Sequence, residues 1–228
     1  MTKNNNYLYL IWKDPQTRLN FTIGKLYRGE KYTFEYFREV GEAENRGWTK
    51  FEVFPEEKAY ESEVLFPVFA SRLPDKKRRD IGKILEKYGL AEFDEFELLR
   101  KSEARLPIDT YSFIDPIFPE EETVQRDFFI MGVRHQTPCK GENCGLLPKV
   151  GVGDELDFET EPENSYDTNA IKVKTKAGEV LGYVPRYYNT AILERLNNGM
   201  TYSCKIIDIN LQQDCSECIK VRLNMPKE

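Results

Sequence analysis

The sequence predicts an α+β N-terminal domain over residues 1–122, followed by a small, mainly-β domain over residues 123–228. Three observations lead to this expectation. A length of 228 residues suits one large domain or two small ones. The stretch "DPIFPEEETVQRD" at 115–127 combines two prolines with three consecutive glutamates, which favours an exposed linker. Strand and helix patterns mix before it, whereas five or six short strands and one helix follow it, as in a partly open barrel.

The strands of the first domain are expected near its start. "YLYLIW" at 7–12 has the composition of a buried strand. Residues 19–37 alternate apolar and polar side chains on both sides of Arg28-Gly29-Glu30, and a glycine at such a point indicates the turn of a β-hairpin.

The helices of the first domain are expected after these strands. Residues 63–90 predict two helices separated at Pro74, with Asp75 as the N-cap of the second helix. Residues 94–106 predict a further short helix, for which Asp94 is the candidate N-cap. Strands followed by helices predict an α+β domain.

The second domain is expected to consist of short strands joined by turns. Apolar and charged residues alternate in stretches such as "DELDFETE", which is typical of strands with one buried face. The expected strands lie within 127–133, 154–161, 170–176, 177–185, 201–211 and 218–225. One helix is expected over 187–199, with Ala191, Leu193 and Leu196 available for packing.

Charge and hydropathy exclude some classes of function. Lys and Arg number 33 and Asp and Glu number 39, so the net charge is −6. Such a chain has no overall attraction to nucleic acid, and binding of that kind needs a local basic patch. The sequence has no run of about 18 apolar residues that would span a membrane. Its first residues lack the apolar core of a signal peptide, so we expect a soluble, cytoplasmic protein.

The five cysteines leave two interpretations open. An odd number argues against a disulfide framework in a cytoplasmic protein. "CKGENC" and "CSEC" contain Cys139, Cys144, Cys215 and Cys218, which offer four thiolates to a zinc ion. The first spacing is loose for a zinc knuckle and polar residues flank both pairs, so free thiols are the simpler expectation. We expect no cofactor.

"GEKYTFEYF", "LFPVFASRLPDKKRRDI" and "FDEFELLRKSEARLPIDTYSFIDP" follow one another in the first domain. In this order they resemble the N-terminal subdomain of HipA-type kinases, over about residues 6–117. The sequence departs from that family because no glycine follows the "LL" of the third stretch. The kinase body that normally follows this subdomain is also missing.

Catalysis is not expected. Neither a G-x-x-x-x-G-K-[ST] nor a G-x-G-x-x-G loop, which would cradle a phosphate, is present in the sequence. Stand-alone copies of the HipA-type subdomain occur in bacterial three-part toxin systems, where they act as antitoxins against a separate kinase. The resemblance therefore implies a protein partner for residues 1–122, such as a HipA-like kinase, and an antitoxin-like role.

"FIMGVRH", "GDELDFETEPENSYDTNAIKV" and "LGYVPRYY" follow one another in the second domain. In this order they closely resemble the HIRAN domain, over about residues 127–224. The resemblance implies an OB-like barrel that recognises single-stranded DNA at its 3′-hydroxyl end. The residues that correspond to the end-binding pocket of that family are Arg134, His135, Asn164, Tyr166, Asp167, Tyr183 and Arg186.

The chemistry of these residue types suits a terminal nucleotide. Tyr166 can stack on a base, which contributes on the order of 1–3 kcal/mol in single-strand binders. Asp167 can accept a hydrogen bond from a 3′-hydroxyl group and would repel a phosphate. Arg134 and Arg186 can form charge-assisted hydrogen bonds to phosphates. His135 departs from the tyrosine of the family and offers less apolar area for stacking.

Two other functions stay open at this point. Tyr166 can simply cover the barrel, and Asn164 can cap a turn through bonds to the backbone. That interpretation leaves an antitoxin-like interaction scaffold that does not bind DNA. Alternatively, Glu161, Glu163 and Asp167 form a carboxylate cluster of the kind that holds Mg²⁺ in nucleases, although no Lys or His base accompanies them.

Overall fold

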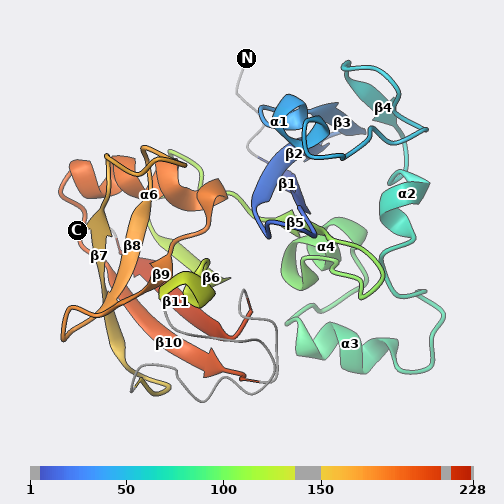
Figure 1. The fold of residues 1–228 in the computed structure, drawn as a ribbon. Helices are drawn as coiled ribbons and strands as arrows, with labels where there is room; N and C mark the ends of the chain where they lie inside the picture. The colour runs from blue at the N-terminus through green and yellow to red at the C-terminus, as the bar shows by residue number, and fades with distance from the viewer. Residues whose placement is uncertain (1–5, 137–149, 212–216, 227–228) are drawn as a thin grey trace. The chain divides into compact units, whose positions relative to one another are not determined.

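The computed structural model describes residues 6–136, 150–211 and 217–226. Its contacts divide the chain into two compact units, Met1–Pro116 and Ile117–Glu228. The division falls inside the stretch that the sequence predicts to be a linker. Each unit has a sheet of its own (Figure 1). Among the residues described, no helix has the length and apolar character needed to cross a membrane.

The first unit contains a five-stranded antiparallel sheet in the order β4-β3-β2-β1-β5. Its strands are β1 (Tyr7–Lys13), β2 (Asn20–Arg28), β3 (Tyr32–Tyr36), β4 (Tyr60–Ser62) and β5 (Tyr111–Ile114). The predicted strand at 7–12 is confirmed as β1. The predicted hairpin is confirmed as the antiparallel pair of β2 and β3.

The helices of this unit are short. They are α1 (Val40–Glu44), α2 (Pro67–Ala70), α3 (Ile81–Lys87) and α4 (Glu95–Ser102). The unit is therefore richer in sheet than the α+β class predicted from the sequence. Pro67 and Pro74 limit helix length between 63 and 80, and the charged run "DKKRRD" offers no apolar face to pack.

One of the two predicted N-caps is confirmed. The Asp94 carboxylate accepts a hydrogen bond from the backbone N–H of Glu97, at 3.0 Å, where α4 begins. The prediction for Asp75 is wrong, because α3 begins only after Asp80. Asp75 Oδ1 instead accepts the N–H of Lys77 at 2.8 Å, in the turn that precedes the helix. A local side-chain bond to the backbone thus forms a turn where a helix start was expected.

Alternate residues of the strands face an aromatic core. Leu8, Leu10 and Trp12 of β1 lie on this face. Phe34 of β3 is fully buried and its ring lies 5.2 Å from the ring of Phe69, measured between centroids. Aromatic side chains bury large apolar areas, so this cluster is a major source of stabilisation for the unit.

The second unit contains a six-stranded antiparallel sheet in the order β6-β11-β10-β7-β8-β9. Its strands are β6 (Val124–Phe129), β7 (Glu155–Thr160), β8 (Ile171–Thr175), β9 (Val180–Tyr183), β10 (Ser203–Ile209) and β11 (Ile219–Met225). Two helices described in this unit are α5 (Val133–Gln136) and α6 (Arg186–Asn197). The sheet curls into a half-barrel (Figure 1), so the prediction of a small, mainly-β domain is confirmed.

The two edges of the curled sheet meet at one point. Met131, which follows β6, and Tyr183 of β9 exchange two backbone hydrogen bonds, each 2.8 Å long. Gly182 permits this approach, because a Cβ there would lie 2.7 Å from Ile130 Cγ2 and closer still to the Met131 carbonyl oxygen. Gly132 then turns the chain with a φ of +71°, which glycine adopts at little cost, and α5 begins. We call this end of the half-barrel its closed end.

Two details of the second unit differ from the sequence prediction. The strand expected at 127–133 is β6 at Val124–Phe129, because the chain leaves the regular pairing with β11 and turns toward β9. The helix expected over 187–199 is confirmed as α6, but the face expected to pack is wrong. On the face that packs, the ring of Tyr188 lies against Phe128, with centroids 5.9 Å apart. The buried residues of α6 are Tyr188, Asn189, Ile192 and Arg195, whereas Ala191, Leu193 and Leu196 are half-buried.

Candidate nucleic-acid interface

The seven predicted binding residues come from four segments near the closed end of the half-barrel. Helix α5 carries two of them, β9 carries one, and the first position of α6 carries one. The remaining three lie in residues 161–170, which we call the β7–β8 loop. In chain order the seven are Arg134, His135, Asn164, Tyr166, Asp167, Tyr183 and Arg186.

Asn164 organises the β7–β8 loop. Its Oδ1 accepts the backbone N–H of Tyr166 at 2.9 Å and that of Asp167 at 3.1 Å. Its Nδ2 donates to Glu161 Oε2 at 2.7 Å. Because most of its hydrogen-bonding capacity is used inside the loop, Asn164 shapes the loop, which is the turn-capping role considered from the sequence.

Glu161 joins this loop to the neighbouring strands. Its Oε1 lies 2.7 Å from Lys172 Nζ in β8, and its Oε2 accepts a hydrogen bond from the Tyr183 hydroxyl at 3.1 Å. Hydrogen bonds from Lys172, Asn164 and Tyr183 hold the pKa of the Glu161 carboxyl below its ordinary value. From the sequence, Glu161 is a candidate metal ligand only, although opposite charges on adjacent strands are a signal for such a pair.

Asp167 is held at two points. Its Oδ1 accepts the backbone N–H of Asn169 at 2.9 Å, within the loop. Its Oδ2 accepts a hydrogen bond from Asn189 Nδ2 at 2.9 Å, and this bond links the loop to α6. Asn189 is only 3% exposed and was missed by the sequence analysis. No local signal marks it, because the packed face of α6 is not the face that the sequence predicts.

Tyr166 projects from the same loop. Its side chain is 82% exposed, so the interpretation in which it covers the barrel is wrong. Its backbone N–H is nevertheless fixed by Asn164. An exposed ring on an ordered backbone offers a surface on which a base can stack.

Helix α5 brings two more of the predicted residues to this end. A Cβ at Gly132 would lie 3.6 Å from the ring of Tyr183 and 4.0 Å from that of His135, so both rings flank the glycine. Arg134 and His135 are exposed. Arg134 Nε donates to His135 Nε2 at 3.1 Å, an arrangement in which the imidazole nitrogen acts as an acceptor.

Together, the four segments offer three kinds of group to a ligand. Tyr166 supplies an exposed ring and Asp167 an anchored carboxylate. Arg134 and Arg186 supply exposed guanidinium groups from α5 and α6. Single-stranded nucleic acid carries matching groups, which are base faces, sugar hydroxyls and phosphates.

Each of the two units matches a known family model. Residues 125–224 match the family model of the HIRAN domain. The second unit is a HIRAN domain. Residues 20–107 match the family model of the HipA N-terminal domain, which the first unit contains. Both resemblances drawn from the sequence are therefore confirmed.

Solved structures similar to part of the chain include the crystal structure of the HIRAN domain of human HLTF. It shares 16% sequence identity with this chain, with a TM-score of 0.34, and the match covers 45% of this chain and 74% of that one. A crystal structure of a protein from Lactobacillus plantarum shares 23% identity, with a TM-score of 0.37, and covers 45% of this chain and 94% of that one. A comparison with curated proteins finds no match.

Two of the three carboxylates of the nuclease hypothesis are engaged in hydrogen bonds or an ion pair. Glu161 is paired with Lys172, Asp167 is bonded to two amides, and Glu163 is exposed. Within the described ranges, no three His, Cys, Asp or Glu side chains are grouped so that they could hold a metal ion. Three of the four cysteines of the zinc hypothesis, Cys139, Cys144 and Cys215, lie outside the described residues.

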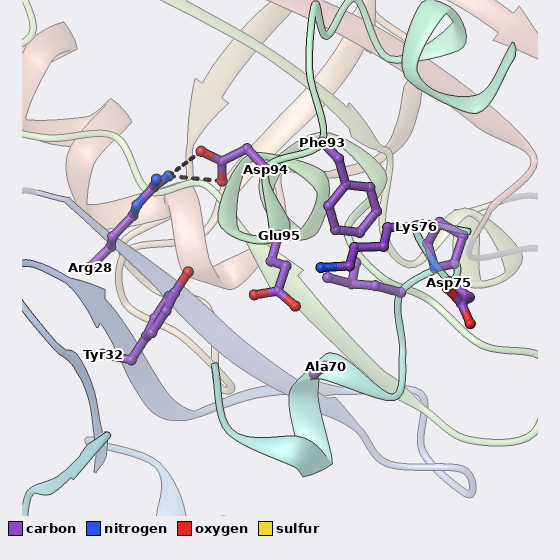
Figure 2. Close-up of a pocket in the computed structure, with 10 residues that line it drawn as sticks. Arg28, Tyr32, Ala70, Asp75, Lys76, Phe93, Asp94 and Glu95 are labelled. Atoms are coloured by element: carbon purple, nitrogen blue, oxygen red, sulfur yellow. Dashed lines mark hydrogen bonds and ion pairs between the residues drawn. The ribbon is translucent and has the colours of Figure 1, made fainter. Parts of the chain in front are cut away.

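The HipA N-terminal domain carries a pocket of about 650 Å³, drawn in Figure 2. On its wall, Arg28 forms an ion pair with Asp94 at 2.7 Å. Glu95 and Lys76 extend into the same space, and the ring of Tyr32 lies at its side (Figure 2). None of the seven predicted binding residues lines this pocket. Acidic and basic side chains both line it, so the pocket favours neither an anionic nor a cationic ligand.

Proposed function

We propose that the HIRAN domain binds single-stranded DNA and recognises its 3′-hydroxyl end at the closed end of the half-barrel. At the level of the family, a HIRAN domain implies binding to single-stranded DNA or DNA ends. The observation that carries the finer proposal is the β7–β8 loop. There, Tyr166 is 82% exposed, one residue from an Asp167 carboxylate that two hydrogen bonds hold in place.

Each side chain meets one part of the terminal nucleotide in this proposal. Tyr166 stacks on the last base. Asp167 accepts a hydrogen bond from the 3′-hydroxyl, because a carboxylate has about four acceptor sites and two hydrogen bonds occupy part of them. Arg134 and Arg186 bind backbone phosphates. These positive groups are local, which is how a chain with a net charge of −6 binds a polyanion.

The test is a fluorescence-anisotropy titration of the full chain with one single strand that ends in either a 3′-hydroxyl or a 3′-phosphate. We expect a preference of about tenfold or more for the hydroxyl, because a hydrogen bond to a charged acceptor contributes roughly 1.5–3 kcal/mol. Asp167→Asn should reduce this preference more than it reduces total affinity, because an amide does not repel phosphate. Equal affinity of the wild type for both strands would mean that the domain reads backbone charge alone.

We also propose that the HipA N-terminal domain binds a separate protein. A HipA-like kinase is the first candidate, in the cytoplasm of a bacterium and in a toxin–antitoxin or phage-defence system. The match of residues 20–107 to the HipA N-terminal family model supports this proposal. The full chain should form a stable complex with such a kinase in light-scattering chromatography. A mixture that elutes as two separate species for each kinase of the native host would contradict it.

The two alternative functions give different results in the same experiments. An antitoxin-like scaffold binds the protein partner but neither DNA strand. We propose that the protein is not catalytic, so a labelled strand should stay intact when it is incubated with the protein and Mg²⁺. Shortening of the strand that Glu163→Gln abolishes would favour a metal-dependent nuclease instead.

A further inference from the structure

We propose that Asn189 positions the Asp167 carboxylate and thereby sets the preference of the HIRAN domain for a hydroxyl end. This inference rests on the proposed function of the same site. Asn189 Nδ2 donates to Asp167 Oδ2 at 2.9 Å. Because Asn189 is 3% exposed, a ligand meets the carboxylate and not the amide, so Asn189 acts through Asp167.

The two hydrogen bonds to Asp167 differ in what they fix. The bond from the Asn169 backbone comes from the same loop, so it moves with the loop. The bond from Asn189 comes from α6, a helix of 12 residues whose Tyr188 packs against Phe128 of β6. Of these two bonds, only the second ties the carboxylate to an element outside the loop.

This tie also relates Asp167 to a cation. Arg186 lies three residues before Asn189 on α6, and residues at that spacing share a face of the helix. The Asn189 bond therefore holds the Asp167 carboxylate beside the first turns of α6, where Arg186 is exposed. A terminal nucleotide offers one hydroxyl and one phosphate to such a pair of groups, whereas an internal nucleotide brings a second phosphate against the carboxylate.

The second polar atom of Asn189 supports a role in positioning. Asn189 Oδ1 is buried and has no hydrogen-bond partner in the part of the chain that the structure describes. An apolar side chain would suit this buried position better than an amide with one unpaired oxygen. The useful property of the amide is thus its donor group, which donates to the Asp167 carboxylate.

The experiment repeats the two-ended anisotropy titration with Asn189→Ala in the full chain, and with Thr190→Ala as a control at the exposed neighbouring position. We expect Asn189→Ala to reduce the preference for the 3′-hydroxyl strand by about threefold or more, since a hydrogen bond to a charged group is lost. Its affinity for the 3′-phosphate strand should change less than about twofold. Thr190→Ala should match the wild type with both strands.

A second variant keeps the inference testable where Asn189→Ala does not fold. Asn189→Leu fills the buried position with an apolar side chain of similar size and removes the donor to Asp167 Oδ2. We expect Asn189→Leu to keep a cooperative thermal melt and to show the same reduced preference for the 3′-hydroxyl strand, and a full preference in this variant would contradict the positioning role.

The possible outcomes separate this inference from the proposed function. If the wild type prefers the hydroxyl end and Asn189→Ala keeps the full preference, the positioning role is wrong and the proposed function stands. If Asn189→Ala lowers the affinity for both strands equally, Asn189 has a structural role only and the inference is also wrong. If the wild type shows no end preference, the proposed function fails, and the inference fails with it.

Discussion

Replacing Asn164 with alanine should loosen the β7–β8 loop while the barrel stays folded. The side chain makes three hydrogen bonds, two to the N–H groups of Tyr166 and Asp167 and one to Glu161, at 2.9, 3.1 and 2.7 Å. Each hydrogen bond contributes roughly 0.5–1.5 kcal/mol net, and partial exposure places these three near the lower end. Their loss should therefore lower the free energy of loop opening by about 1.5–2 kcal/mol, which is roughly a ten- to thirty-fold change in the opening equilibrium.

The assay is amide exchange with solvent, followed by NMR on the full chain. The N–H groups of Tyr166 and Asp167 should exchange roughly ten- to thirty-fold faster in Asn164→Ala, and the amides of β8 should keep their wild-type rates. Asn164→Asp is the matched control, because it keeps the acceptor oxygen but faces Glu161 with a second negative charge, so its rates should lie between the two. Unchanged exchange at Tyr166 and Asp167 would refute the claim that Asn164 organises the loop, and faster exchange throughout β8 would show that it supports the whole barrel.

Three further results are expected. Tyr166→Ala should weaken single-strand binding by on the order of 1–3 kcal/mol through lost stacking and leave the melting temperature unchanged, since the ring is 82% exposed; equal anisotropy titrations would remove Tyr166 from the site. Gly182→Ala should lower the melting temperature of the HIRAN domain, because the added Cβ collides with the Met131 carbonyl oxygen, and a wild-type melt would contradict the account of barrel closure. Hydrogen bonding from Lys172 holds the pKa of Glu161 below its ordinary value, so the stability that it contributes is present above the unfolded-state pKa, near about 4.3, and is lost as the pH falls through the lower folded-state pKa. Thermal melts of the wild type and Glu161→Gln should therefore converge at acidic pH, and a gap between them that does not change with pH would contradict the ion-pair assignment.

Features of the fold that depend on neighbouring residues were predictable. The alternation around residues 28–30 predicts the β2–β3 hairpin, and the structure pairs these strands in register. Asp94 caps α4 because its carboxylate needs only the N–H of Glu97, three residues along the chain. The β-strands of the HIRAN domain follow from the same kind of pattern, since alternation of apolar and charged residues reflects one buried face.

Features that depend on distant residues were not predictable from pattern. Asp75 lies before a helical stretch, but its bond to the N–H of Lys77 forms a turn and α3 starts later. The packed face of α6 includes the contact of Tyr188 with Phe128, which lies far away in the sequence on β6. Closure of the half-barrel needs a close approach of Gly182 to Met131, and no local sequence pattern indicates this contact.

The candidate site shows the same division. The seven residues of the site came from the resemblance to the HIRAN family, and the structure supplies the contacts that join their segments. The exposure of Tyr166 and the bond from Asn189 to Asp167 depend on how the loop lies against α6. Asn164 proved to be a residue that shapes the loop, because its oxygen is committed to two backbone N–H groups. Direct contact of the other residues with DNA stays a prediction.

A chemical-shift titration tests the central claim most directly. A short single strand with a 3′-hydroxyl end is added to the isotope-labelled full chain, and the backbone amide signals are followed to saturation. We predict that the perturbed signals cluster in residues 131–135, 161–170 and 183–189, and that signals of the HipA N-terminal domain do not move. Perturbations centred on β10 and β11 or on the HipA N-terminal domain, or an unchanged spectrum at saturating strand, would contradict the claim that the closed end of the half-barrel binds DNA.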